Sequence, residues 1–113
     1  MKKTLYLPLK AKWYDMIESG IKTEEYRKIM PYWIKRICEK SKGCIYGRDG
    51  MCELCMHTYG VHTNITDVCF SYGYTKRKML FPVEKISIGE GNPQWGAPND
   101  ETVFIIKLKG DKR

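Results

Sequence analysis

The chain has 113 residues, of which 42% are hydrophobic and 29% charged, and its 20 Lys and Arg against 13 Asp and Glu give a formal net charge of +7. This length and composition are typical of one globular domain over residues 1–113, and they exclude a disordered or low-complexity chain. No apolar segment approaches the roughly 18 to 20 residues that span a bilayer, so we expect no membrane partner and a cytoplasmic location.

The first half of the sequence predicts strands and helices in alternation. Pro8 favours a sheet edge for the first strand, because proline cannot donate to a ladder of hydrogen bonds. Gly20 falls where a helix ends in a left-handed residue, and Pro31 takes the favoured position in the first turn of the next helix. The expected elements are a strand at 4–9, a helix at 10–20, a short strand at 22–28 and a helix at 31–40.

The second half predicts strands alone. Three segments, 67–74, 78–89 and 101–110, are rich in β-branched and aromatic residues and are separated by glycines. Before them, residues 41–64 contain four glycines, three cysteines and two histidines without a periodic apolar pattern, which indicates a Cys-rich inserted loop. Helices that come early and strands that come late predict an α+β fold with a mostly antiparallel sheet or a small barrel.

Both faces of the predicted strand at 22–28 are charged. Residues two apart share a face of a strand, so Glu25 and Arg27 should point one way and Lys22 the other. Charge is costly to bury, so this strand should lie at a sheet edge or line a hydrated pocket. In such a pocket Lys22 and Arg27 would donate to a phosphate, and Glu25 would accept from a base or hold the guanidinium. The alternative is a solvated edge where Glu25 and Arg27 simply pair.

The spacing G-x-K-x-x-E-x-R, formed by Gly20, Lys22, Glu25 and Arg27, resembles the signature of the ASCH domain, a member of the PUA-like superfamily. The segment LPLKAKWYDMIESG resembles the opening strand and helix of that family. The segments FSYGY, VEKISIGEGN and GNPQWGAP resemble a branch that is common in phages and bacterial mobile elements. The resemblance covers every predicted element but not the Cys-rich loop. It implies a small PUA-like β-barrel with helices closing its ends and a cleft at the motif that binds RNA or a nucleotide.

The resemblance also implies two alternatives to simple binding. Some ASCH proteins are amidohydrolases that act on N4-acetylated cytidine with a Lys, a Thr and a Glu. Lys22 matches the first, but Glu25 stands where those enzymes have the Thr, and Thr23 would point away; if the chain is an enzyme, Lys22 and Glu25 are the expected catalytic residues. Other relatives are described as ribonucleases. A further alternative is an adaptor that binds a protein through the Cys-rich lobe.

Four cysteines predict a structural zinc site. Cys52 and Cys55 form a C-x2-C pair, the spacing that lets two thiolates reach one zinc ion. Cys44 is the expected third ligand and Cys38 the fourth, although either of two nearby histidines could replace one of them. Without a metal this loop has few apolar residues with which to fold. The alternatives are thiols that bind nothing and a redox pair.

Basic and aromatic residues in two other places suit a nucleic acid. Lys76, Arg77 and Lys78 form a predicted turn beside Tyr72, and unpaired bases stack on rings while the backbone meets positive charge. Turns are also charged for solubility alone. Trp95 lies in a loop rich in glycine and proline, where it would be a stacking platform for a base or a plug at one end of the barrel.

Overall fold

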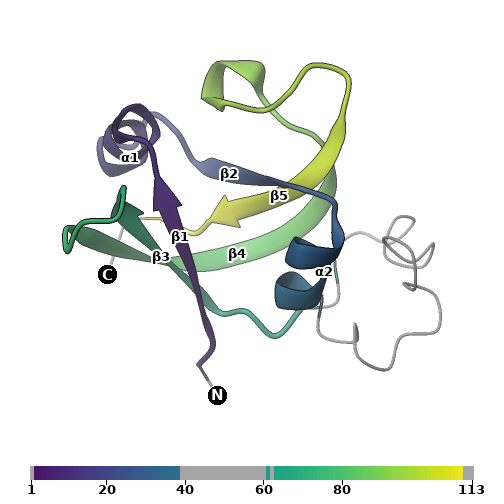
Figure 1. Cartoon of the computed structure of the whole chain (residues 1–113), viewed down its shortest axis with the longest axis horizontal. Coiled ribbons are helices and arrows are strands. Elements are labelled where there is room, and N and C mark those ends of the chain that lie inside the picture. The colour runs from purple at the N-terminus through teal and green to yellow at the C-terminus, as the bar shows by residue number, and fades with distance from the viewer. Residues whose placement is uncertain (1, 39–60, 62, 111–113) are drawn as a thin grey trace.

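The computed structural model describes residues 2–38, 61 and 63–110 (Figure 1). Every helix and strand predicted from the sequence is present, and the ends differ by a few residues. The elements in chain order are β1 (Thr4–Leu9), α1 (Ala11–Glu18), β2 (Glu24–Lys28), α2 (Pro31–Ile37), β3 (Asp67–Tyr72), β4 (Lys78–Glu90), a 3-10 turn at Pro93–Trp95, and β5 (Thr102–Leu108).

The five strands form one curled sheet in the order β1-β3-β4-β5-β2, which makes a half-barrel (Figure 1). The β1 and β3 strands are parallel, and every other pair is antiparallel. The long β4 strand pairs with β3 through its first part and with β5 through its second, with an irregular register between Val83 and Lys85. Such an irregularity increases local twist. The α+β class and the mostly antiparallel pairing are therefore confirmed.

The two edge strands carry the residues that sheet interiors exclude. Pro8 lies on β1, whose partner is β3, as its missing N–H predicts. The charged β2 strand pairs with β5 and lies at the opposite edge of the sheet, with Glu25 opposite Ile106 and Arg27 opposite Phe104. Of the two positions predicted for this strand, a sheet edge or the wall of a hydrated pocket, the structure shows the sheet edge.

Both helices bury one face against the inside of the curl. Tyr14 and Ile17 of α1 are buried, and so are Ile34 and Ile37 of α2. Neither helix in the described part of the chain is long and apolar enough to cross a membrane. The inward side chains of the sheet belong to the same core. They are Leu5, Leu7, Leu9, Val68, Phe70, Met79, Phe81, Ile86, Phe104, Ile106 and Leu108. Gly20 ends α1 with a φ of 86°, the left-handed conformation that turns the chain back toward β2.

Candidate functional site

Lys22 lies in the loop between α1 and β2, two residues before the strand begins at Glu24. The left-handed Gly20 reverses the chain here, and the backbone N–H of Lys22 donates to the carbonyl of Met16 at 3.0 Å. Strand alternation therefore does not govern Lys22. The prediction that Lys22 and Glu25 point to opposite faces is wrong, because the strand starts after Lys22 and the turn directs both side chains to one point.

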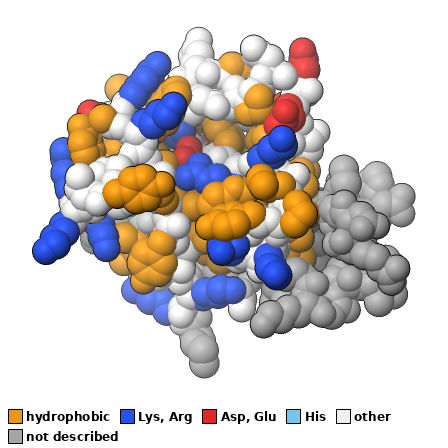
Figure 2. Space-filling model, in the orientation of Figure 1, with side chains coloured by type: hydrophobic (Ala, Val, Ile, Leu, Met, Phe, Trp, Pro, Cys, Tyr) orange, Lys and Arg blue, Asp and Glu red, His pale blue; other side chains and the backbone are white. Residues whose placement is uncertain are grey.

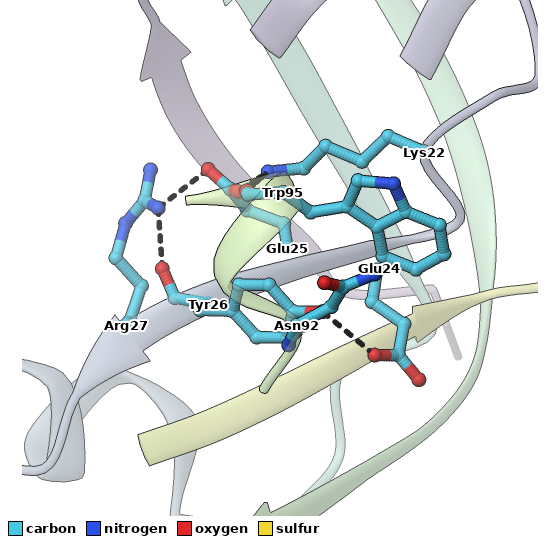
Figure 3. Close-up of polar contacts among 7 residues, drawn as sticks. All are labelled: Lys22, Glu24, Glu25, Tyr26, Arg27, Asn92 and Trp95. Atoms are coloured by element: carbon cyan, nitrogen blue, oxygen red, sulfur yellow. Dashed lines mark hydrogen bonds and ion pairs between the residues drawn. The ribbon is translucent and has the colours of Figure 1, made fainter. Parts of the chain in front are cut away.

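The Glu25 carboxylate is held between two cations (Figure 3). Lys22 Nζ lies 2.7 Å from Oε1, and Arg27 Nη1 lies 2.6 Å from Oε2. Lys22 is 1% exposed and Glu25 is 4% exposed, whereas the Arg27 side chain is 17% exposed. Burying charges costs several kcal/mol for each ion unless they are paired and hydrogen bonded. These three groups are paired, they carry a net charge of +1, and Arg27 is the member that solvent reaches.

The remaining partners of Lys22 enclose it. Its Nζ also donates to the backbone carbonyl of Trp95, and it lies 4.7 Å from the centre of the Trp13 ring and 5.4 Å from that of the Tyr26 ring. Burial lowers the pKa of Lys22, and the neighbouring Glu25 opposes that shift. Because its contacts are all within the protein, Lys22 fixes the position of Glu25 and of the loop that carries Trp95.

A second set of hydrogen bonds ties the same loop to β2. The Tyr26 hydroxyl donates to Glu24 at 2.9 Å and accepts from the backbone N–H of Asn92 at 3.0 Å (Figure 3). Burial raises the pKa of Tyr26 to about 12. The half-buried Trp95 packs against a small cluster formed by Tyr26, Ala97 and Val103. The loop after β4 thus closes one side of the carboxylate site.

Aromatic side chains of α2 lie on the other side of Arg27. The Arg27 guanidinium carbon is 5.3 Å from the centre of the Trp33 ring, and Tyr32 meets Trp33 edge to face at 4.7 Å. The Arg36 guanidinium carbon in turn lies 3.5 Å from the centre of the Tyr32 ring. Figure 2 shows a hollow over β2 with acidic and basic side chains inside it and hydrophobic side chains on its rim. Arg27 Nη1 donates to Glu25 and to the Tyr26 carbonyl.

A cavity of about 530 Å³ lies beside the α1–β2 loop. Its volume is within the range of small-molecule sites, roughly 300 to 1,000 Å³. Thr23 is exposed and lines this cavity together with Lys22. The cavity is lined by Ile17, Glu18, Ser19, Gly20, Lys22, Thr23, Phe81, Leu108 and Gly110.

The basic turn between β3 and β4 packs against α1. Arg77 Nη2 lies 2.8 Å from Glu18 Oε1, and its guanidinium lies 5.0 Å from the Tyr14 ring and 4.9 Å from the Tyr72 ring. Lys76 and Lys78 are exposed. Within the described residues, none of the hydrogen bonds, ion pairs or ring contacts joins this turn to the motif. The structure brings Lys22, Glu25, Arg27 and Trp95 together and places the turn elsewhere.

The predicted zinc site lies almost wholly outside the described residues. Cys44, Cys52 and Cys55 are not among them, and Cys38 is buried in the main core just after α2. Among the residues that the structure does describe, no group of three or more His, Cys, Asp or Glu side chains is arranged to hold a metal ion. Zinc therefore stays a prediction from the cysteine spacing.

Comparisons with models of protein families, with curated proteins and with solved structures gave no match.

Two residues of the site were missed from the sequence. Trp13 lies in the segment expected as a helix and Tyr26 in the segment expected as a strand, and neither is singled out by the sequence, yet both rings face the Lys22 ammonium.

Proposed function

We propose that this chain is an ASCH-type, PUA-like domain, of the branch found in phages and mobile elements, that binds RNA or a nucleotide in the hollow over β2. One observation carries the proposal: the buried Glu25 carboxylate is held between Lys22 and Arg27. A protein that has well-packed hydrophobic residues in place of such a buried ion network is often at least as stable. Buried and perturbed ionisable groups cluster at functional sites. The half-barrel fold is compatible with the family, and the motif spacing supports it.

The chemistry of the hollow suits a nucleotide. Arg27 would donate from Nε and Nη2 to a phosphate, as a planar fork suited to its oxygens. Trp33 beside it offers an aromatic surface for a base. Glu25, fixed by two cations, would use its remaining lone pairs to accept from an exocyclic amino group. Lys22 would act as a positioning residue, because at 1% exposure it makes its contacts inside the protein.

Calorimetric titration with the four ribonucleoside monophosphates tests this proposal. We expect Arg27→Ala to weaken binding roughly tenfold or more, since a charge-assisted hydrogen bond is lost, and Arg27→Lys to recover part of it. Lys28→Ala is the matched control, because Lys28 is the next residue on β2, is exposed and carries the same charge. Equal affinities for Arg27→Ala and Lys28→Ala would contradict the proposed site.

A second candidate is hydrolysis of an N4-acylated cytidine or of RNA. The observation that favours it is the lowered pKa of Lys22, whose Nζ lies 2.7 Å from the Glu25 carboxylate. A lysine shifted in this direction suits proton transfer near neutral pH better than an exposed one. Chromatography of N4-acetylcytidine after incubation with the protein tests it. Turnover that is lost in Lys22→Arg, with the fold checked by circular dichroism, would support hydrolysis, and absence of turnover in the wild type would exclude this substrate.

A further inference from the structure

The outer face of the sheet carries a second feature, a groove of about 170 Å³ beside β1 and β3. It lies outside the hydrogen bonds and ion pairs of the motif. The residues that line it include Tyr6 and Pro8 of β1, Cys69 and Ser71 of β3, Tyr74 of the β3–β4 turn, and Lys78 at the start of β4.

Two tyrosine rings in this groove are presented to solvent. Tyr6 is 68% exposed and Tyr74 is 97% exposed. The alternation of β1 explains the first, because Leu5 and Leu7 point into the core and Tyr6 therefore points outward. The second follows Gly73, whose φ of 58° turns the chain away from β3. Neither ring belongs to the hydrophobic core, so both present their aromatic surface to solvent.

The surroundings of the groove are basic. Lys78 lines it, and the exposed Lys76 lies two residues before. On the part of the viewed face that lies over β1 and β3, Figure 2 shows basic and hydrophobic side chains and no acidic ones among the described residues. This distribution is complementary to a polyanion. Arg77 of the same turn is engaged with Glu18, which leaves the two lysines as the cations for a ligand.

The volume of the groove indicates what kind of contact it can make with a ligand. A volume of about 170 Å³ is below the roughly 300 Å³ at which sites begin to enclose small ligands. A base that lies flat on an exposed ring does not need enclosure, and stacking on aromatic side chains together with a basic track is how single strands are bound. A duplex hides the faces of its bases, so the tyrosines favour unpaired nucleotides.

We propose that this groove is a second contact for single-stranded RNA, in which Tyr6 and Tyr74 stack on bases and Lys76 and Lys78 neutralise phosphates. The proposal extends the proposed function, because the hollow over β2 and the basic area over β1 and β3 are on the same face of the molecule (Figure 2). One strand would meet both. The groove contact itself does not require the hollow to be occupied.

Fluorescence anisotropy with a labelled oligouridine of about ten nucleotides tests the groove, since single-strand sites span roughly 4 to 16 nucleotides. We expect Tyr6→Ala and Tyr74→Ala each to raise the Kd roughly fivefold or more, the lower end of measured stacking effects. The matched control is the pair Tyr6→Phe and Tyr74→Phe, which keeps both rings and should keep the affinity. Circular dichroism establishes that each variant is folded.

Salt dependence tests the lysines separately. For a single strand, the logarithm of the binding constant falls with the logarithm of the salt concentration, with a slope of about −0.7 for each neutralised phosphate. The double variant Lys76→Gln/Lys78→Gln should therefore reduce the magnitude of this slope by about 1.4. Lys28→Gln, on the distant edge strand β2, is the control and should leave the slope unchanged. An unchanged slope in the double variant would overturn the role of the two lysines.

The outcomes separate the groove from the hollow. Loss of oligouridine affinity in the tyrosine variants, with mononucleotide binding intact, supports the groove. The same loss in a protein that binds no mononucleotide supports the groove and contradicts the proposed function. An unchanged Kd in Tyr6→Ala/Tyr74→Ala, equal binding of duplex RNA, or no affinity of the wild type for oligouridine at low salt would each overturn the groove, whatever Arg27→Ala does.

Discussion

Lys22 Nζ lies 2.7 Å from Glu25 Oε1 and also donates to the backbone carbonyl of Trp95. One buried ammonium therefore joins three segments: the loop after α1, the edge strand β2 and the loop after β4. Because Lys22 is 1% exposed, these bonds form away from solvent, where electrostatic interactions are stronger than in water. The position of the site carboxylate thus depends on a residue that no ligand needs to touch.

Replacing Lys22 by methionine should destabilise the protein. The substitution keeps the length of the side chain but leaves the Trp95 carbonyl without its donor and Glu25 with Arg27 as its one cation. Removing one partner of a buried ion pair costs about 3 to 5 kcal/mol, and we expect the lower end because Arg27 remains. Urea unfolding measures the change.

The control for this change is Lys28→Met, at an exposed position of β2. Exposed substitutions of this kind usually alter stability by less than about 0.5 kcal/mol. If Lys22→Met unfolds at the same urea concentration as the control, the buried network does not form in solution.

Tyr26 should make stability fall at high pH. Its pKa is raised to about 12 in the folded protein, against 10.0 for an ordinary tyrosine, so the unfolded chain loses this proton first. The stability that the Tyr26 hydroxyl contributes to the folded protein is fully present below about pH 10 and is lost as the pH rises through about 12. A shift of about 2 units corresponds to about 2 to 3 kcal/mol in total.

Tyr26→Phe isolates this effect, because it has no hydroxyl to titrate. We expect the stability difference between wild type and Tyr26→Phe to shrink by about 2 kcal/mol between about pH 9 and about pH 11.5. Tyr14, whose pKa is also raised, and Lys22, whose pKa is lowered, are present in both proteins and cancel in the difference. A constant difference across this range would show that the hydroxyl is not buried.

Local patterns in the sequence were sufficient for the elements but not for their pairing. Gly20, Pro31 and the alternation of β1 mark ends and faces through their nearest neighbours, so the helices and strands were predicted correctly. The parallel pairing of β1 with β3 joins Thr4 to Asp67, and no short-range pattern encodes such a contact. The pairing of β1 with β3 therefore became visible in the structure alone.

The same limit applies to the candidate site. The motif spacing brought Lys22, Glu25 and Arg27 to attention, but the direction of Lys22 was wrong because the start of β2 was placed two residues too early. Trp13 meets Gly96 across the fold, where a Cβ would lie 3.0 Å from its ring. That tryptophan lies in the segment expected as a helix, and helical spacing holds no information about the lysine that it covers.

Gly91 should not tolerate even a methyl group. An added Cβ would lie 2.5 Å from Tyr26 Cε1 and 2.7 Å from the Ala97 Cβ, closer than such atoms approach. Both neighbours belong to the small cluster beneath the loop, so the loop must shift. We expect Gly91→Ala to cost about 1 to 3 kcal/mol, as overpacking usually does, and to weaken mononucleotide binding because the loop closes the carboxylate site.

Gly89, two residues earlier, is the matched control. An added Cβ there would lie 3.5 Å from Ile105 Cδ1, an ordinary contact. Gly89→Ala should leave stability unchanged or raise it slightly, because alanine restricts the unfolded chain. Thermal unfolding of both variants decides the matter, and equal midpoints would mean that the loop is not seated on Tyr26.

Zinc content is the measurement for the Cys-rich loop. If Cys52 and Cys55 hold a zinc ion with Cys44 and Cys38, protein purified without chelator should contain about one equivalent, and Cys52→Ser should lose most of it. Cys69→Ser is the matched control, since Cys69 lies half-buried on β3 and is outside the predicted ligand set. Chelator should also lower the melting temperature of the wild type. Less than about a tenth of an equivalent, together with an unchanged melting temperature after chelation, would assign these cysteines to free thiols, because a structural zinc contributes directly to folding.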